Sequence, residues 1–238
     1  MIKLTINTQP NDETCGATCL HAVYRHYGLS LSLDEIRAGV QRSLSGGTLT
    51  PLLGTHALQH GFETTLYTNN LIAFDPSWFE PSGACDESLI TNKLLTQLHH
   101  KHDENMVQLT NAYVQYFQHG GKLHFLTITA QLLKNYFQQN IPVIAALSAT
   151  YLYNCPRERF TEGVSIFDDI QGTPCGHFVV LCGYDEEKKH IVVADPHREN
   201  PLANDNYYKV NISRLINAIM LGVLTHDGHL LIIKPQGM

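Results

Sequence analysis

The feature that most constrains this chain is residues 9–24, which are typical of a loop that runs into a helix with a cysteine in its first turn. The N-terminus of a helix presents unpaired backbone N–H groups and the positive end of the dipole, and both favour a thiolate. Cys15 stands at this point, and Gly16 leaves the backbone beside it open. The Gln9 side-chain amide and the Cys15 N–H are two donors for one oxyanion, so the stretch predicts a nucleophilic thiol.

A free cysteine is more often a small buried apolar residue, so this interpretation needs partners elsewhere in the chain. His177 opens an apolar run to residue 181, and a second apolar run at 191–194 leads into Asp195. A turn-forming segment, 185–189, separates the two runs. In a hairpin centred on that turn, the start of the first strand meets the end of the second. His177 and Asp195 are therefore predicted to be neighbours.

Two other residues compete for these positions. Asp185 is a second carboxylate, but it lies in the turn at the far end of the hairpin, about 25 Å away along an extended strand. His197 follows Asp195 closely, yet residues 174–176, Pro-Cys-Gly, suit a backbone brought close to a cleft and precede His177. We therefore favour His177 as the base and Asp195 as the group that orients it.

The chain order of thiol, histidine and carboxylate is that of a papain-like site. The Gln-x5-Cys-Gly stretch, the His-Phe-Val-Val-Leu strand and the Val-Ala-Asp-Pro end are together similar to those of the bacteriocin-leader (double-glycine) peptidases and their stand-alone relatives, which are papain-fold cysteine peptidases. The resemblance covers about the first 70 residues and the part from about 127 to the end. It implies Cys15 as nucleophile, His177 as base, Asp195 as orienter and Gln9 as oxyanion donor.

The expected fold class is α+β, a single papain-like domain over residues 1–238 with N-terminal helices packed on an antiparallel sheet. Capping signals predict a helix from Leu33, after the Ser-x-x-Glu box at Ser32, and another that Thr50 caps. Residues 69–122 read as an inserted helical hairpin, with helices at 86–101 and 104–119. Residues 148–176 are predicted to be a long loop, and loops of that length are usually functional.

Composition excludes several classes of partner. A net charge of -6 with 16 basic residues gives no electrostatic footprint for nucleic acid. The longest apolar run, 141–147, is too short to span a bilayer. Six dispersed cysteines and an N-terminus without a signal-peptide core predict a cytoplasmic protein, although leaderless export or effector secretion stays open.

No cofactor or metal is expected. The densest histidine group, residues 99–102, has no carboxylate or cysteine at ligand spacing, and adjacent helical side chains point in different directions. Cys15 and Cys19 are one helical turn apart without a second ligand pair, so Cys19 is predicted to be a buried helix residue. Trp78 and Phe79 either fix their loop to the core or line a substrate groove.

Two classes of function remain. The first is a thiol hydrolase, a cysteine peptidase or amidase that acts on a peptide or amide bond through an acyl-enzyme; replacing water by an amine acceptor makes it an acyltransferase. The second is a catalytically silent module that binds a peptide in the same cleft. The presence of all four site residues favours the enzyme.

Overall fold

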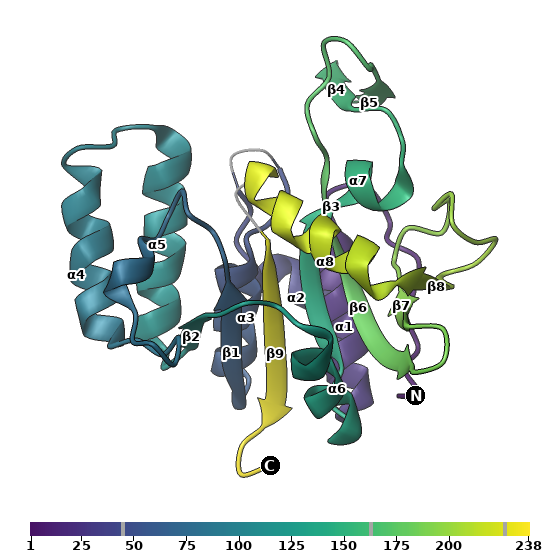
Figure 1. Cartoon of the computed structure of the whole chain (residues 1–238), viewed down its shortest axis with the longest axis horizontal. Coiled ribbons are helices and arrows are strands. Elements are labelled where there is room, and N and C mark those ends of the chain that lie inside the picture. The colour runs from purple at the N-terminus through teal and green to yellow at the C-terminus, as the bar shows by residue number, and fades with distance from the viewer. Residues whose placement is uncertain (44–45, 162–163, 226–227) are drawn as a thin grey trace.

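A seven-stranded sheet with the strand order β2-β1-β9-β3-β6-β7-β8 runs through the middle of the molecule (Figure 1). The computed structural model describes residues 1–43, 46–161, 164–225 and 228–238. The strands of this sheet are β1 (Phe62–Thr68), β2 (Lys122–Phe125), β3 (Val143–Ser148), β6 (Gly176–Asp185), β7 (His190–Ala194), β8 (Tyr207–Asn211) and β9 (His229–Pro235). Neighbouring strands are antiparallel except β1 and β2, which are parallel, so the predicted antiparallel sheet carries one parallel edge strand.

Helices cover both faces of the sheet. The described helices are α1 (Cys15–His26), α2 (Leu33–Gly39), α3 (Thr50–Gln59), α4 (Glu87–Leu98), α5 (Glu104–Gln118), α6 (Ala130–Gln138), α7 (Ala149–Tyr153) and α8 (Ile212–Leu221), with short 3-10 turns η1 (Pro76–Trp78) and η2 (Gly222–Thr225). Helices α1 to α3 lie on one face, and α6 to α8 lie on the other.

The central strands are buried on both faces, because successive side chains point alternately into a first core, under the N-terminal helices, and a second core, under α6 to α8. In β3, Ile144 and Ala146 pack with the N-terminal helices, whereas Ala145 and Leu147 pack with α6 to α8. In β6 the next residue after the His177 position, Phe178, belongs to the first core. This double burial holds β6 rigidly between β3 and β7, and so fixes the start of the strand that carries His177.

Local sequence signals explain where the first helices begin. The Ser32 hydroxyl accepts from the Glu35 N–H, and the Glu35 carboxylate accepts from the Ser32 N–H, so the predicted capping box is confirmed. The predicted cap at Thr50 is wrong. Thr50 is the first residue inside α3 and Leu49 stands at the N-cap, because Pro51 already fits the first turn and the chain before it is extended.

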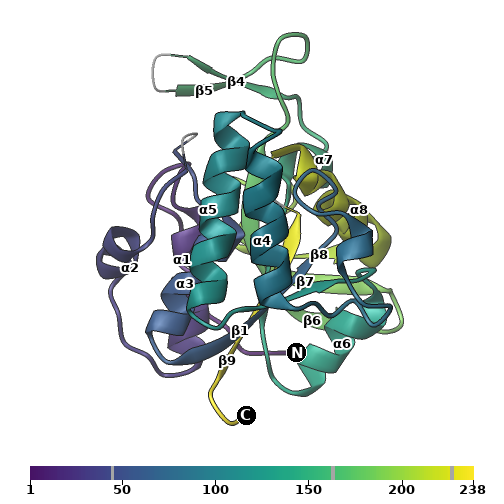
Figure 2. The same cartoon turned by 90° about the vertical axis from the view of Figure 1, so that its left-hand side faces the viewer.

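The two helices predicted within residues 69–122 are present as α4 and α5, which pack side by side next to the edge of the sheet (Figure 2). A buried hydrogen bond joins the Tyr113 hydroxyl of α5 to Nε2 of His229 at the start of β9. The helical pair is therefore fastened to the central sheet. That the segment is an insertion into a shorter domain stays a prediction.

The preceding aromatic loop packs on this helical pair. Phe79 contacts Phe74 and Phe125, with ring centroids 5.8 and 5.1 Å apart, and Trp78 lies half-buried against the same core. Of the two interpretations of Trp78 and Phe79, these contacts favour the one in which they fix the loop.

The prediction of a structureless loop over residues 148–176 is wrong. The segment contains α7 and a separate two-stranded hairpin, β4 (Glu158–Thr161) and β5 (Val164–Phe167), which projects from the body of the molecule (Figure 1). Ser148 caps α7 by accepting from the Tyr151 N–H, and Asn154 ends it in the left-handed region at φ 56°. These short elements lack the long hydrophobic period that reveals a helix or strand in a sequence.

Candidate active site

Cys15 is the first residue of α1, as predicted, and its side chain is mostly buried. Thr14 occupies the N-cap position, but its side chain caps no helical N–H; the hydroxyl donates instead to the carbonyl of Asn11 at 2.9 Å. The N–H groups at the start of α1 are thus not used by a side-chain cap. The positive end of the helix dipole is directed at the residue that carries the thiol.

His177 and Asp195 are neighbours, which confirms the predicted hairpin. Strands β6 and β7 are antiparallel, with Val180 opposite Ala194, so the start of β6 and the end of β7 meet. Nε2 of His177 lies 2.8 Å from Oδ1 of Asp195. Both side chains are buried, His177 at 8% exposure and Asp195 at 0%.

Cys15 lies near enough to His177 to influence the pKa of that imidazole. Because Asp195 occupies Nε2 of His177, Nδ1 is the ring nitrogen left for the thiol. Burial alone lowers the pKa of His177, but the charge of Asp195, its hydrogen bond and the contact with Cys15 together raise that pKa to about 10. The arrangement favours an imidazolium between two acidic groups.

Asp195 is held by more donors than His177 alone. The hydroxyls of Tyr153 and Tyr208 both lie 2.7 Å from Oδ2, and the backbone N–H of His197 donates to Oδ1 at 2.8 Å. Burial by itself raises the pKa of a carboxyl group, yet His177 and the two tyrosines hold the pKa of Asp195 below its ordinary value. The carboxylate is therefore stable as an anion in a fully buried position.

Gln9 lies beside the same corner of the sheet. Its backbone N–H donates to the carbonyl of Pro196 at 2.9 Å, directly after Asp195. Its side-chain Oε1 is buried and has no hydrogen-bond partner among the described residues. The unpaired atom is an acceptor, whereas an oxyanion would bind the Nε2 donor of the same amide, so the role of Gln9 as oxyanion donor stays a prediction.

The structure gives Gly16 a role in packing. A Cβ at this position would lie 2.7 Å from Cγ2 of Thr48, 3.2 Å from Leu53 and 3.3 Å from Phe178. The side of Gly16 on which a Cβ would lie is therefore filled by protein, and access of a substrate carbonyl to the Cys15 N–H stays a prediction. Glycine is required here because the first turn of α1 packs closely against a loop, α3 and β6.

The competing residues are placed as the sequence predicts. Asp185 lies opposite His190 at the far end of the hairpin and pairs with Lys209 at 3.1 Å. Cys19 is fully buried in α1 and its thiol donates to the carbonyl of Phe178. The His197 ring is 6.2 Å from the His177 ring, but only the His197 backbone contacts Asp195.

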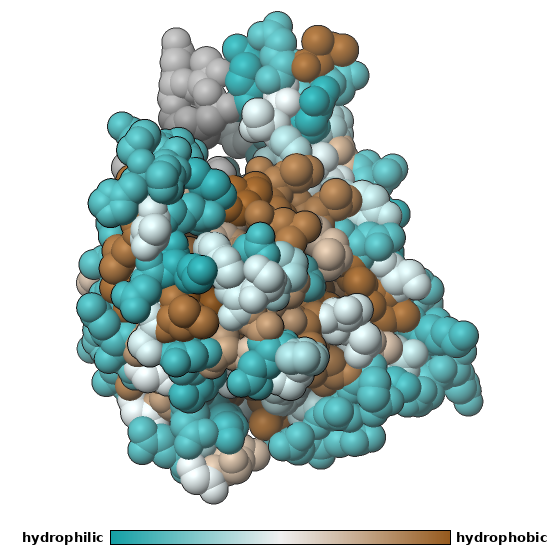
Figure 3. All heavy atoms as spheres, turned by 60° about the vertical axis from the view of Figure 1, so that its left-hand side comes forward, coloured by the Kyte–Doolittle hydropathy of each residue, from teal (hydrophilic) through white to brown (hydrophobic). Residues whose placement is uncertain are grey.

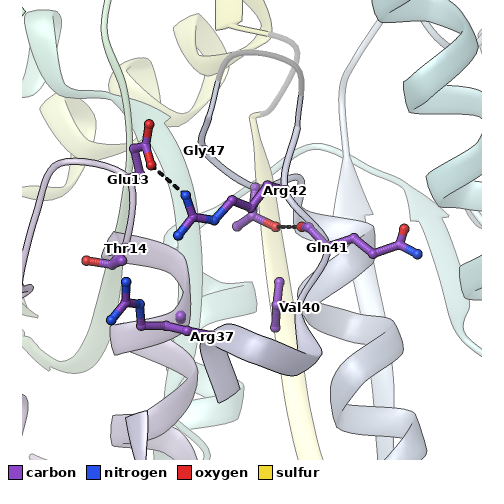
Figure 4. A pocket seen from close by; sticks show the side chains of 9 residues that line it. Glu13, Thr14, Arg37, Val40, Gln41, Arg42 and Gly47 are labelled. Atoms are coloured by element: carbon purple, nitrogen blue, oxygen red, sulfur yellow. Dashed lines mark hydrogen bonds and ion pairs between the residues drawn. The ribbon is translucent and has the colours of Figure 1, made fainter. Parts of the chain in front are cut away.

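A small hollow lies next to the start of α1, between α2 and the loop that follows it (Figure 4). Arg42 forms an ion pair with Glu13 at 2.8 Å, and the Thr48 hydroxyl donates to the carbonyl of Gln41 at 3.0 Å. The ion pair joins the loop after α2 to Glu13, two residues before Cys15, and the hydrogen bond closes the loop itself. They hold in place the chain that leads into the candidate nucleophile.

Two tyrosines of the site were not predicted. Tyr208 lies on β8, where buried and exposed residues alternate. That alternation is the signal that could have identified Tyr208 as a side chain pointing into the protein. Tyr153 ends α7 within the segment expected to be a loop, and nothing in its sequence surroundings points to Asp195.

Among the residues that the structure describes, no group of three or more His, Cys, Asp or Glu side chains gathers as metal ligands do. The six cysteines are all free thiols. In the same described part of the chain, no helix is long and apolar enough to cross a membrane.

A helix that starts at a cysteine, packed on a mostly antiparallel sheet that presents a paired histidine and aspartate, has the α+β architecture of papain-like cysteine peptidases. The model of the Peptidase_C39 like family matches residues 1–217, so the chain belongs to this family. The resemblance seen in the sequence and the predicted fold class are both confirmed.

Several solved structures are similar to the chain. They include the peptidase domain of Streptococcus ComA, a bifunctional ABC transporter involved in quorum sensing, with 15% identity, a TM-score of 0.43, and 99% of this chain and 100% of that chain covered. A double-glycine motif protease from an AMS/PCAT transporter, solved with its leader peptide, has 16% identity, a TM-score of 0.44, and coverages of 99% and 94%. Xylellain, a cysteine protease from Xylella fastidiosa, has 12% identity, a TM-score of 0.43, and coverages of 99% and 84%. No curated protein sequence matches the chain.

Proposed function

We propose that this protein is a thiol hydrolase that cleaves a peptide or amide bond through an acyl-enzyme on Cys15. The observation that carries the proposal is the buried pair of His177 and Asp195, which leaves Nδ1 of the imidazole for Cys15 at the start of α1. A nucleophile, a base and a group that orients the base form the minimal unit of such an enzyme.

The geometry supports a two-step reaction. Sγ of Cys15 attacks the amide carbonyl carbon, and the oxyanion accepts hydrogen bonds from the Gln9 side-chain amide and the Cys15 N–H. His177 donates its Nδ1 proton to the leaving nitrogen as the C–N bond breaks, which leaves a thioester on Cys15. Nδ1 then takes a proton from water, whose oxygen attacks the thioester and releases the carboxylic acid together with the regenerated thiolate.

A peptide is the substrate class that the surface supports best. Apolar side chains gather on the face beside the helical pair (Figure 3). Among the described residues, the end of α8 and η2 expose Met220, Leu221 and Leu224, the last at 60%. Apolar surface of this kind suits a peptide with apolar side chains, whereas the net charge of -6 disfavours polyanions.

The cytoplasmic location stays a prediction.

Acyl transfer to an amine is the second candidate, because the same thioester serves either acceptor. A test that covers both candidates uses a peptide p-nitrophenyl ester with intact-mass measurement after acid quenching. We expect an acyl adduct on Cys15 that disappears with time in water and yields an amide product when an amine is added. A silent binding module would bind peptide and show no adduct, and that result would overturn the proposal.

A further inference from the structure

The carboxylate of Asp195 makes more contacts than orienting one histidine requires. Oδ1 accepts from Nε2 of His177 and the backbone N–H of His197, whereas Oδ2 accepts from two phenol hydroxyls, each at 2.7 Å. Those hydroxyls come from elements far apart in the chain: Tyr153 ends α7, and Tyr208 lies on β8. Neither contact is needed to form the hairpin that joins β6 to β7.

We propose that Tyr153 and Tyr208 are positioning residues that keep the carboxylate of Asp195 ionised and turned toward His177. The inference rests on the proposed function and adds two members to its site. With both lone-pair regions of Oδ2 filled, Oδ1 is the oxygen left to face the imidazole, so the carboxylate cannot rotate without breaking two hydrogen bonds.

Both phenols act as donors over the whole range in which such an enzyme works. Burial, followed by the charge of Asp195, raises the pKa of Tyr153 and of Tyr208 above that of an ordinary tyrosine. Each hydroxyl therefore keeps its proton and gives it to Oδ2. The Tyr153 ring also lies 6.0 Å from the His177 ring, so it limits the space into which the imidazole can turn.

The other titratable groups around the pair come from α1, the chain before β6 and the chain after β7. Cys15 interacts with His177, and Cys19 interacts with the charge of Asp195. Cys175 precedes His177 by two residues and interacts with Cys15. The His197 ring lies 6.2 Å from His177. Of these groups, Cys15 also interacts with Tyr153 and Cys19 with Tyr208.

The proposal predicts a pH signature that a purely structural role does not. Removing donors from a carboxylate favours its protonated form, so Asp195 gains a proton at higher pH when the hydroxyls are lost. The acid midpoint at which Asp195 itself titrates should therefore rise when the hydroxyls are removed, whereas substitutions that only loosen the packing leave it in place.

The experiment follows the ¹³C carboxyl resonance of Asp195 against pH in the full-length protein. Variants Tyr153→Phe, Tyr208→Phe and the double variant are compared with wild type. We expect the acid midpoint to rise in each single variant and by at least about one pH unit in the double variant, the size expected for lost hydrogen bonds to a charged group.

Neighbouring tyrosines supply matched controls. The Tyr207 hydroxyl donates to the carbonyl of Leu4, and the Tyr151 hydroxyl accepts from Asn217, so neither bonds to Asp195. Tyr207→Phe and Tyr151→Phe should leave the acid midpoint unchanged. An unmoved midpoint in a double variant that melts cooperatively, or an equal shift in the controls, would overturn the inference.

A measurement on the unmodified protein keeps the inference testable if the double variant does not fold. The ¹³C carboxyl resonance of Asp195 should titrate below the range of an ordinary aspartate, and titration at or above that range contradicts the inference. Failure of the proposed function looks different, because Cys15 would then alkylate no faster than the other cysteines in wild type at any pH.

Discussion

Nε2 of His177 lies 2.8 Å from Oδ1 of Asp195, and this contact leaves Nδ1 as the only ring nitrogen able to face Cys15. The tautomer and the orientation of the imidazole are thereby set by a residue on the neighbouring strand. Because β6 is buried on both faces, the backbone that carries the histidine is held in place by the sheet. The chemical predictions below depend on this relationship.

Cys15→Ala should abolish turnover of a peptide ester or amide and leave the fold intact. The substitution removes one sulfur atom at the start of α1, and alanine is well tolerated in a helix. A thermal melt near that of wild type with no measurable turnover is the expected pair of results. Cys19→Ala is the control; it removes a fully buried thiol from the same helix and should lower stability with less effect on activity.

Gln9→Ala should slow acylation by about a hundredfold, the usual effect of removing one oxyanion donor. The rate of Cys15 alkylation should change little, because iodoacetamide has no oxyanion to stabilise. Comparing the two rates in one protein separates oxyanion stabilisation from thiol activation. Equal acylation rates in Gln9→Ala and wild type would show that another donor supplies the hydrogen bond.

The alkaline limb of activity should follow His177. Because the folded-state pKa of this histidine is raised to about 10, the imidazolium persists below that pH and is lost as the pH rises through it. Asp195→Asn removes the neighbouring charge and should move this limb to lower pH by ~1–3 units while reducing the rate. Asp185→Asn, at the far end of the same hairpin, should do neither. A limb that moves only in Asp185→Asn would assign the wrong carboxylate to the histidine.

A second buried histidine should make stability depend on pH. Nδ1 of His56 is 2.8 Å from the Tyr24 hydroxyl, and its ring stacks on His60 at 4.2 Å. Burial, with a smaller effect of His60, lowers the pKa of His56 to about 4. The unfolded chain, with an ordinary pKa, binds a proton that the folded protein excludes, so stability is complete above about pH 6.5 and falls toward pH 4.

The size of this effect is up to about 3 kcal/mol if His56 is the only group involved. Urea unfolding midpoints at pH 7 and pH 5 should differ more in wild type than in His56→Gln, which retains an acceptor for Tyr24 and cannot titrate. An equal pH dependence in the two proteins would assign the acid sensitivity to other groups.

The sequence predicts His177 and Asp195 correctly as neighbours because their signal is local, whereas Cys15 is joined to them only through the family resemblance. The first turn of α1 has a recognisable start, and the hairpin places the other two residues together through antiparallel pairing with a short turn. The position of β9 between β1 and β3 has no such signal. It depends on pairing of β9 with β1, more than 150 residues earlier in the chain, and with β3, and single-sequence periodicity does not encode such pairing.

Tyr153 and Gly16 show what else sequence reasoning misses. Tyr153 reaches Asp195 only because α7 folds back over the start of β6, and that helix is too short for its period to be read. The sequence shows Gly16 only as a residue that leaves the backbone beside Cys15 open, whereas its neighbours Thr48 and Phe178 show that it also permits close packing. Both depend on contacts between distant segments, which become visible only once those segments are placed.

The most direct measurement is competitive alkylation of all six thiols at neutral pH with limiting iodoacetamide, quantified for each cysteine by peptide mass spectrometry. We predict that Cys15 reacts far faster than the half-buried Cys85, Cys155 and Cys175, and that His177→Ala removes this advantage. Equal reactivity of Cys15 and the other thiols in wild type, or an advantage that survives His177→Ala, would show that Cys15 and His177 do not form an activated pair.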